Sequence, residues 1–308
     1  MSPAKEREPW PSPDYQLVDF GQGRKLERFS GQLFDRPCPA AERSRCQHSA
    51  LWREADYRFV RATSASGGGS VAAGEWSGPT LPEQPPAMIS FHDFHLQLKC
   101  TPSGQLGIFP EQAENWRWIA ARAEEAHREH PLKLLNLFAY TGGTTLAAAA
   151  RGAEVTHVDS ARSVVQWARE NAEASGLGQA PIRWIQEDAL RFVQRELKRG
   201  HHYDGVVLDP PTYGHGPKRE VWNIERDLPE LLRLCGQLTA GRRGLLLLTC
   251  HSPGLTVARL SDLTAQHFGA RPDPPGCGDL WLPTSDGRQL HSGHCVRLAR
   301  WPMPKEAR

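Results

Sequence analysis

From residue 116 onward, apolar segments suited to strands alternate with segments suited to helices. The apolar segments predict strands at residues 132–140, 154–159, 181–188, 203–211 and 244–250. The remaining segments predict helices at residues 116–129, 144–151, 163–174, 189–199, 221–238 and 257–268. Strands that are apolar on both faces and separated by helices are typical of a parallel sheet covered on both sides. The pattern therefore predicts a doubly wound, Rossmann-like α/β fold.

The first third of the chain has a different pattern. Residues 15–62 contain short strand-like stretches separated by glycine turns, and residues 91–100 alternate apolar and polar side chains toward their end. Residues 64–70 (SASGGGS) and the proline-rich residues 78–87 are typical of loops. We expect a flexible tail at residues 1–14, a small β-rich module at residues 15–103, and the α/β domain at residues 104–308. The Asp286-Gly287 turn predicts an antiparallel hairpin that closes this domain.

Composition narrows the class of protein. The 308 residues include 37 Lys and Arg and 35 Asp and Glu, a net charge of +2, which argues against a general polyanion binder. Residues 21–61 nevertheless carry nine basic against five acidic residues, which permits a local basic face. The longest aliphatic run, residues 245–248, is too short to cross a membrane, and the N-terminus does not resemble a secretory signal. Seven scattered cysteines without a CxxC pair favour a cytoplasmic protein without a disulfide framework.

Residues with ligand-binding chemistry follow successive predicted strands. In doubly wound sheets the ligand lies outside the carboxyl ends of the strands. The first strand runs into a glycine turn at residues 139–143, where a bare backbone allows close approach of a ligand. Asp159 ends the second strand and could accept both hydroxyls of a ribose, and Asp188 ends the third and suits an amino group of adenine. The fourth strand ends in a rigid loop formed by Asp209, Pro210, Pro211, Thr212 and Tyr213, which could hold a planar substrate group.

The segments FAYTGG, VDSARSVVQWARENAEASGL, EDALRFV and DPPTYGHGPKR resemble successive motifs of class I S-adenosylmethionine-dependent methyltransferases. They look most similar to bacterial enzymes that methylate cytosine at carbon 5 or guanine at nitrogen 7 in large-subunit ribosomal RNA. The resemblance covers residues 104–300. It implies S-adenosylmethionine as cofactor and RNA as partner. Residues 1–103 do not resemble the small RNA-binding domain usual in that family.

The resemblance also assigns roles to individual residues. Asp159 would bind the ribose, Asp188 would lie near the adenine, and Asp209 would lie near the transferred methyl group. The segment LGIFPEQAENW resembles a family segment that touches the cofactor, with Gln112 matching and Ala113 standing where arginine is usual. The cofactor-binding residues implied in this way are Gln112, Phe138, Ala139, Tyr140, Thr141, Gly142, Asp159, Ser160, Asp188, Ala189 and Asp209.

Catalysis depends on which acceptor atom the enzyme methylates. Cys250 ends the fifth strand, where the cytosine-methylating relatives place a nucleophilic cysteine, and the nitrogen-methylating relatives have none. Asp209 and Cys250 are therefore the candidate catalytic residues, with carbon 5 of cytosine the first choice of acceptor. A buried and inert Cys250 is the alternative. His251 could lower the pKa of this thiol, although consecutive strand residues point to opposite faces.

Two alternatives to this function remain open. The same fold could methylate a nitrogen in RNA, protein or a small molecule, or it could survive as a noncatalytic scaffold that binds the cofactor. We expect no metal site, because His291, His294 and Cys295 lie in a predicted terminal hairpin without a second ligand cluster. The sequence leaves the oligomeric state open.

Overall fold

The computed structural model describes residues 10, 14–61, 74–79, 87–216, 221–272 and 276–300. The chain divides into two compact units. The N-terminal unit comprises residues 1–113 and 281–292, and the C-terminal unit comprises residues 114–280 and 293–308. The predicted boundary between residues 103 and 104 lies upstream of this division. No helix among the described residues is long and apolar enough to span a bilayer.

The large sheet has seven strands in the order β10-β9-β8-β11-β14-β16-β15. Strands β8 to β11 and β14 are parallel, and β16 runs antiparallel to β14. Their bounds are β8 (Lys133–Leu137), β9 (Glu154–Asp159), β10 (Ile182–Gln186), β11 (Gly205–Leu208), β14 (Leu245–Cys250), β15 (Cys277–Pro283) and β16 (Gln289–Leu298). The doubly wound sheet and its antiparallel C-terminal strands confirm the predicted fold class.

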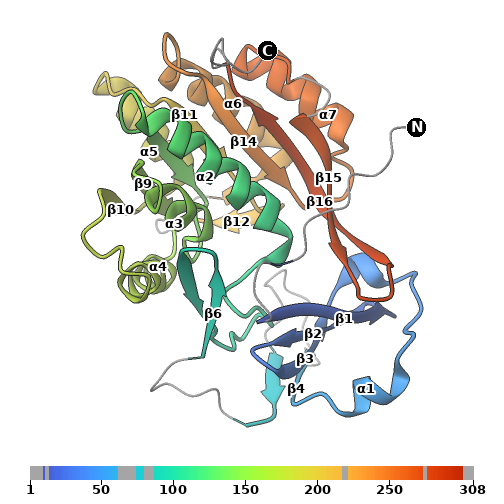
Figure 1. Ribbon diagram of the computed structural model, residues 1–308. Helices are drawn as coiled ribbons and strands as arrows, with labels where there is room; N and C mark the ends of the chain where they lie inside the picture. The colour runs from blue at the N-terminus through green and yellow to red at the C-terminus, as the bar shows by residue number, and fades with distance from the viewer. Residues whose placement is uncertain are drawn as a thin grey trace, which may run out of the picture. The chain divides into compact units, whose positions relative to one another are not determined.

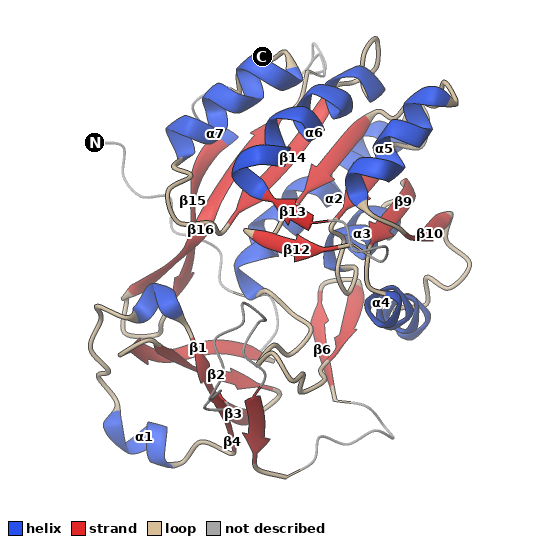
Figure 2. Ribbon diagram, turned by 180° about the vertical axis from the view of Figure 1, so that it is seen from behind, coloured by secondary structure: helices blue, strands red, loops and turns tan. Residues whose placement is uncertain are grey.

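Helices cover both faces of this sheet (Figures 1 and 2). Helices α2 to α4 lie on one face and α5 to α7 on the other. Their bounds are α2 (Ala113–His127), α3 (Gly143–Ala149), α4 (Arg162–Ala174), α5 (Ala189–Lys198), α6 (Ile224–Leu238) and α7 (Val257–Leu263), which continues as a π-helix over Thr264–Phe268. The central strands β8, β11 and β14 are almost wholly buried, as their continuous apolar sequences require.

One predicted helix starts later than the apolar pattern indicates. The structure begins α6 at Ile224 instead of residue 221, because Asn223 caps the helix by accepting from the backbone N–H groups of Glu225 and Arg226. Residues Val221–Asn223 form strand β13, which pairs with β12 (Tyr213–His215). The chain after β11 therefore folds back on itself as a short hairpin.

The N-terminal unit is rich in strands, as predicted. Its five-stranded sheet has the order β1-β2-β3-β4-β5, and β6 pairs with β7 in a separate hairpin. The bounds are β1 (Tyr15–Gly21), β2 (Arg24–Phe29), β3 (Gln32–Pro37), β4 (Tyr57–Arg61), β5 (Gly74–Ser77), β6 (Met88–Phe91) and β7 (Phe94–Gln97), with α1 (Ser49–Arg53) and two 3₁₀-helices, η1 (Pro39–Ala41) and η2 (Pro110–Gln112).

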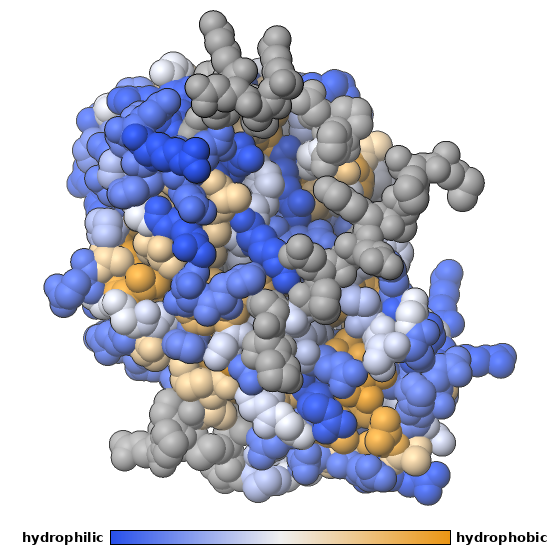
Figure 3. Space-filling view, in the orientation of Figure 1, coloured by the Kyte–Doolittle hydropathy of each residue, from blue (hydrophilic) through white to orange (hydrophobic). Residues whose placement is uncertain are grey.

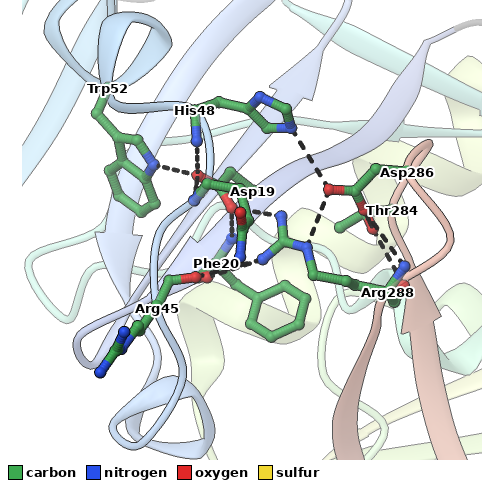
Figure 4. Close-up of polar contacts among 9 residues, drawn as sticks. Asp19, Phe20, Arg45, His48, Trp52, Thr284, Asp286 and Arg288 are labelled. Carbon is green, nitrogen blue, oxygen red and sulfur yellow. Dashed lines mark hydrogen bonds and ion pairs between the residues drawn. The ribbon is translucent and has the colours of Figure 1, made fainter.

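Buried charges organise this unit. Asp19 on β1 accepts hydrogen bonds from the backbone of Gln47 and His48 and from the indole of Trp52, and it pairs with Arg288 from the hairpin between β15 and β16 (Figure 4). Glu27 pairs at 2.5 Å with the buried guanidinium of Arg36. Because both carboxylates are paired, a strand module of this size can bury them.

The predicted tail and the two predicted loops lie mostly outside the described residues. Within the tail, Trp10 is described: its indole donates to the backbone oxygen of Ser90 and packs edge-on against Phe91. Residues 64–70 lie outside the described residues, as do residues 80–86 of the proline-rich segment.

Candidate functional site

The carboxyl ends of β8, β9, β10 and β11 surround a pocket in the C-terminal unit. This is the edge at which the strand order reverses, since β8 lies between β9 and β11. The pocket is lined by Phe138, Val158, Asp159, Ser160, Glu187, Asp188, Ala189, Pro211, Gly214, Gly216 and Trp222. Six of the residues proposed from the sequence therefore meet here: Phe138, Asp159, Ser160, Asp188, Ala189 and Pro211.

The turn after β8 has an unusual backbone. Phe138 and Tyr140 adopt positive φ angles of 56° and 49°, and Gly142 follows at 94° as the residue that precedes α3. Non-glycine residues in this region store strain that the surroundings must offset. The backbone N–H of Tyr140 donates to Asp159 at 3.0 Å, and the buried side chain of Asn171 donates to the backbone oxygen of Thr141 at 2.9 Å. These bonds hold the predicted residues 138–142 in one conformation.

Asp159 joins this turn to the end of β9. One carboxylate oxygen accepts from Tyr140 and the other from the backbone N–H of Ala161, both at 3.0 Å. Burial raises the pKa of Asp159, and these backbone hydrogen bonds oppose the shift. The backbone N–H of Ser160 is a third donor to this carboxylate, whose two oxygens together have about four acceptor positions. The group therefore keeps capacity to accept a hydroxyl donor from a ligand.

Asp188 begins α5. Its side chain accepts from the backbone N–H of Arg191 at 3.0 Å and so caps the helix, while the residue also lines the pocket. Asp188 thus follows a strand, as predicted, and also caps the next helix. The capping hydrogen bond holds its carboxylate in position. Gln112 lies in η2 and is buried within the N-terminal unit.

A second group of polar side chains lies at the neighbouring ends of β11 and β14. The hydroxyl of Thr249 donates to Asp209 at 2.5 Å, and Nε2 of His251 lies 3.5 Å from the same carboxylate oxygen. Burial would raise the pKa of Asp209, but the hydrogen bond and charge of His251 and the bond from Thr249 lower it below its ordinary value. Asp209 is therefore held as an anion.

His251 in this role was not foreseen from the sequence. Thr249 and His251 are two positions apart at the end of a strand, and alternation directs such residues to the same side. That signal was present in the sequence. Gly293 makes the arrangement possible, because a Cβ at this position would lie 2.8 Å from Nδ1 of His251.

Cys250 lies in the core. Its side chain is fully buried among the apolar residues that cover the sheet, and its sulfur accepts from the backbone N–H of Ser252 at 3.4 Å. Burial raises the pKa of this thiol, and the charge of Asp209 adds to the shift. The raised pKa disfavours the thiolate form that a nucleophile needs. The catalytic role of Cys250 stays a prediction.

The loop after β11 forms one wall of the pocket. Pro211 lines it, and the backbone oxygen of Pro211 accepts from the indole of Trp222 at 2.7 Å. The hydroxyl of Thr212 lies 2.7 Å from that of Ser252, while Tyr213 is 69% exposed. Trp222 packs against Phe138 with ring centroids 5.0 Å apart. Two aromatic rings and a proline thus line this side of the pocket.

The two histidines of the predicted terminal hairpin, His291 and His294, belong to different units. Nδ1 of His294 lies 2.6 Å from the carboxylate of Asp279 in the C-terminal unit. His291 belongs to the N-terminal unit, where its ring packs edge-on against Trp281 at 5.1 Å.

Comparison with known proteins identifies the family. A family model described as S-adenosylmethionine-dependent methyltransferase matches residues 75–261, which extends further upstream than the predicted domain. The crystal structure of a SAM-dependent methyltransferase from Agrobacterium tumefaciens superposes with a TM-score of 0.82 and 34% identity, covering 94% of this chain and 91% of that one. The SMU.776 protein, crystallised with SAH, shares the fold at 17% identity, with a TM-score of 0.71 over 94% of this chain and 76% of that one.

Curated relatives are longer proteins that match a smaller part of this chain. The ribosomal RNA large subunit methyltransferase K/L of Shewanella frigidimarina is 37% identical over 46% of this chain and 19% of its own length. The methyltransferase I of Klebsiella pneumoniae is 27% identical over 59% of this chain and 44% of its own length. This chain therefore spans less than half the length of these relatives. Both the family model and the Agrobacterium structure show that the chain belongs to the S-adenosylmethionine-dependent methyltransferase family, whose cofactor is S-adenosylmethionine.

Proposed function

We propose that this protein transfers a methyl group from S-adenosylmethionine to a nitrogen of an RNA base. The observation that carries the proposal is the carboxylate of Asp209, which is bonded to Thr249 and lies 3.5 Å from His251, two residues before Pro211 of the pocket wall. The curated relatives are named as ribosomal RNA methyltransferases, which favours RNA as the acceptor.

The residues of the pocket fit the cofactor. The pocket combines the small residues Ala189, Gly214 and Gly216 with an aromatic ring and two aspartates that can accept hydrogen bonds. We assign Asp159 to the ribose hydroxyls and Asp188 to the adenine amino group, with residues 138–142 providing a backbone surface for the rest of the molecule. The contact of Gln112 with the cofactor stays a prediction from the sequence. When bound, the cofactor supplies an electrophilic methyl group on a positively charged sulfur.

The protein would orient the acceptor base toward the methyl group and stabilise the charge that develops on the acceptor nitrogen. Methylation of an acceptor nitrogen would place positive charge on that nitrogen until its proton is lost, so a carboxylate beside it would stabilise the transition state. Asp209, whose pKa is lowered by its two partners, would accept a hydrogen bond from an amino group and stabilise this charge. Pro211 and Trp222 provide flat surfaces on which a base would be held.

The carbon-5 alternative requires more of Cys250. Its thiolate would have to attack carbon 6 of cytosine, but the side chain is fully buried and its pKa is raised. This geometry favours the nitrogen acceptor over carbon 5, the first choice from the sequence.

Methyl transfer from radiolabelled S-adenosylmethionine tests the proposal. Unmodified ribosomal RNA, a protein extract and free nucleosides would be compared, followed by nucleoside analysis of labelled RNA. We expect label on a nitrogen of a base. Label as 5-methylcytosine that disappears in Cys250→Ser would restore the carbon-5 mechanism. Label in protein alone would contradict the RNA acceptor, and cofactor binding without transfer to any acceptor would favour the noncatalytic scaffold.

A further inference from the structure

A second, open groove lies on the surface of the C-terminal unit, between α4 and β10. It has a volume of about 870 Å³ and is lined by Ala161, Arg162, Ser163, Val165, Gln166, Arg169, Trp184 and Gln186. Figure 3 shows hydrophilic and hydrophobic side chains side by side over this part of the molecule. No role in the proposed methyl transfer has so far been assigned to any of these residues.

The sequence of β10 directs an aromatic ring into this groove. β10 is the edge strand of the sheet, and its residues alternate between the two faces. Trp184 faces α4, where its ring lies 4.8 Å from that of the buried His157. Arg183 faces the opposite side, where its guanidinium lies over the ring of Phe192 on α5. The indole of Trp184 is half-buried: it packs against His157, and part of it is accessible to solvent.

The charge of the groove is positive. Arg162 and Arg169 are exposed, and no acidic residue is among the lining residues. Within the described part of the chain, neither arginine lies within 4 Å of a carboxylate, whereas Arg183 and Arg195 on the other face pair with Glu196 and Glu187. The side-chain amide of Gln166 donates to Glu170 at 3.3 Å on the exposed side of α4.

The groove continues into the cofactor pocket. Ser160 and Glu187 line the pocket, and their chain neighbours Ala161 and Gln186 line the groove. The side-chain amide of Gln186 lies 3.5 Å from the backbone oxygen of Ser160, so the two segments also meet across the boundary. A chain lying in the groove would therefore lead directly to the pocket.

We propose that this groove binds a single-stranded segment of the RNA substrate next to the target base. Arginines that lack protein carboxylates suit phosphates, and a partly exposed indole suits stacking by a base of any sequence. The amides of Gln166 and Gln186 add hydrogen-bonding capacity. This inference rests on the proposed RNA acceptor and deepens it, because it identifies where RNA outside the target base would lie.

The test uses the full chain with Arg162→Glu and Arg169→Glu combined. Binding of a fluorescein-labelled, unstructured 12-nucleotide RNA would be followed by anisotropy at several salt concentrations. We expect affinity to fall about tenfold or more at 0.1 M salt, and the slope of log K against log salt to decrease by about 1.4 in magnitude, as expected for two lost phosphate contacts on a single strand. Trp184 should also be the tryptophan that crosslinks to the RNA under ultraviolet light.

A matched control carries the same change in charge elsewhere. Arg242 and Arg259 are exposed and lie away from the groove, so Arg242→Glu with Arg259→Glu should leave affinity and slope close to those of the unmodified protein. Calorimetric titration with S-adenosylmethionine shows whether each variant is folded and binds cofactor. Equal loss of RNA binding in both double variants would contradict binding of RNA in the groove. The loss would then be a general effect of the reduced positive charge.

The outcomes separate this inference from the proposed function. If the unmodified protein methylates RNA and the groove variant binds and methylates it equally well, RNA binding in the groove is contradicted. The proposed function is then unaffected. If the unmodified protein binds cofactor but neither binds the oligonucleotide nor labels RNA, both are wrong. If labelling of ribosomal RNA falls in the groove variant while cofactor affinity is unchanged, the groove is supported.

Discussion

Arg288 donates to Asp19 at 2.6 Å across a separation of 269 residues in the chain. Asp19 is fully buried on β1, and Arg288 also bonds to Asp286 and lies 4.8 Å from the ring of Phe20. His48 lies 3.4 Å from Asp286 at the edge of the same cluster (Figure 4). The hairpin between β15 and β16 thus supplies the cation that neutralises a buried carboxylate of the N-terminal unit.

Replacing Arg288 by Met should destabilise the protein by about 3 kcal/mol, because it leaves Asp19 buried without its cation. Urea unfolding at pH 7 measures the loss. Arg271→Met is the control, since Arg271 pairs with Asp262 in a largely exposed position and should cost less than about 1 kcal/mol. Equal costs for the two variants would contradict a stabilising role of the buried pair.

The same cluster predicts how stability depends on pH. Burial raises the pKa of Asp19, but the bonds from His48, Trp52, Arg288 and Gln47 outweigh it and lower the pKa below its ordinary value. A carboxyl with a lowered folded-state pKa contributes stability above about pH 4 and loses it as the pH falls further. Asp19→Asn should therefore show a shallower decrease in unfolding free energy below pH 4. An unchanged slope would exclude Asp19 as the group responsible.

Asp209→Asn should lower the methyl-transfer rate about 100-fold while the protein remains folded, because the anion that stabilises charge on the acceptor is removed. Measurements of kcat under saturating cofactor, with calorimetry as a test of cofactor binding, would check this. A rate within a few-fold of the unmodified enzyme would rule out the electrostatic role.

His251→Gln should move the acid limb of the pH–rate profile upward. His251 and Thr249 lower the pKa of Asp209, so removal of the imidazole lets that pKa rise and the anion is lost at a higher pH. Thr249→Val should shift the limb in the same direction. A limb that stays in place in both variants would show that Asp209 does not set it.

Cys250→Ser distinguishes the two acceptor atoms. If the acceptor is nitrogen, the variant should keep kcat within about threefold while losing about 1–3 kcal/mol of stability, since a hydroxyl replaces a thiol in the apolar core. Activity and unfolding would be measured on the same preparation. Loss of activity at a temperature where the variant is fully folded would instead identify Cys250 as the nucleophile.

Gly143→Ala should destabilise the protein by about 1–3 kcal/mol, because its Cβ would lie 2.6 Å from the ring of Trp116. Gly178→Ala is the matched control, since its Cβ would meet only Glu173, at 3.5 Å. Thermal unfolding of both variants would show whether the close packing of α3 on α2 requires glycine at position 143.

The sheet and the strand-end residues could be predicted because each depends on local pattern. Asp159 and Asp188 follow apolar strands, and parallel topology brings such ends to one edge. The positive φ angles of Phe138 and Tyr140 could not be predicted, because long-range bonds from Asp159 and Asn171 hold this turn. The pairing of Asp209 with His251 likewise depends on how β11 and β14 lie side by side.

Two segments differ from what the local sequence pattern predicts. Val221 and Trp222 are apolar and lie just before the helical pattern of α6, yet residues 221–223 pair with Tyr213–His215, and Asn223 caps the helix so that it begins at Ile224. Residues 281–292 were predicted as part of the α/β domain, whereas they pack with the N-terminal unit. Pairing of Asp19 with Arg288 is a contact between ends of the chain, which no local window contains.

The position of Arg288 also constrains when the N-terminal unit can finish folding. During synthesis from the N-terminus, residues 15–113 emerge long before residues 281–292 exist. Until then Asp19 has its hydrogen-bond donors but no cation, so the N-terminal unit can complete its folding only after residues 281–292 have been made. A nascent chain arrested before residue 288 should therefore be more sensitive to protease within residues 15–61 than one arrested after it.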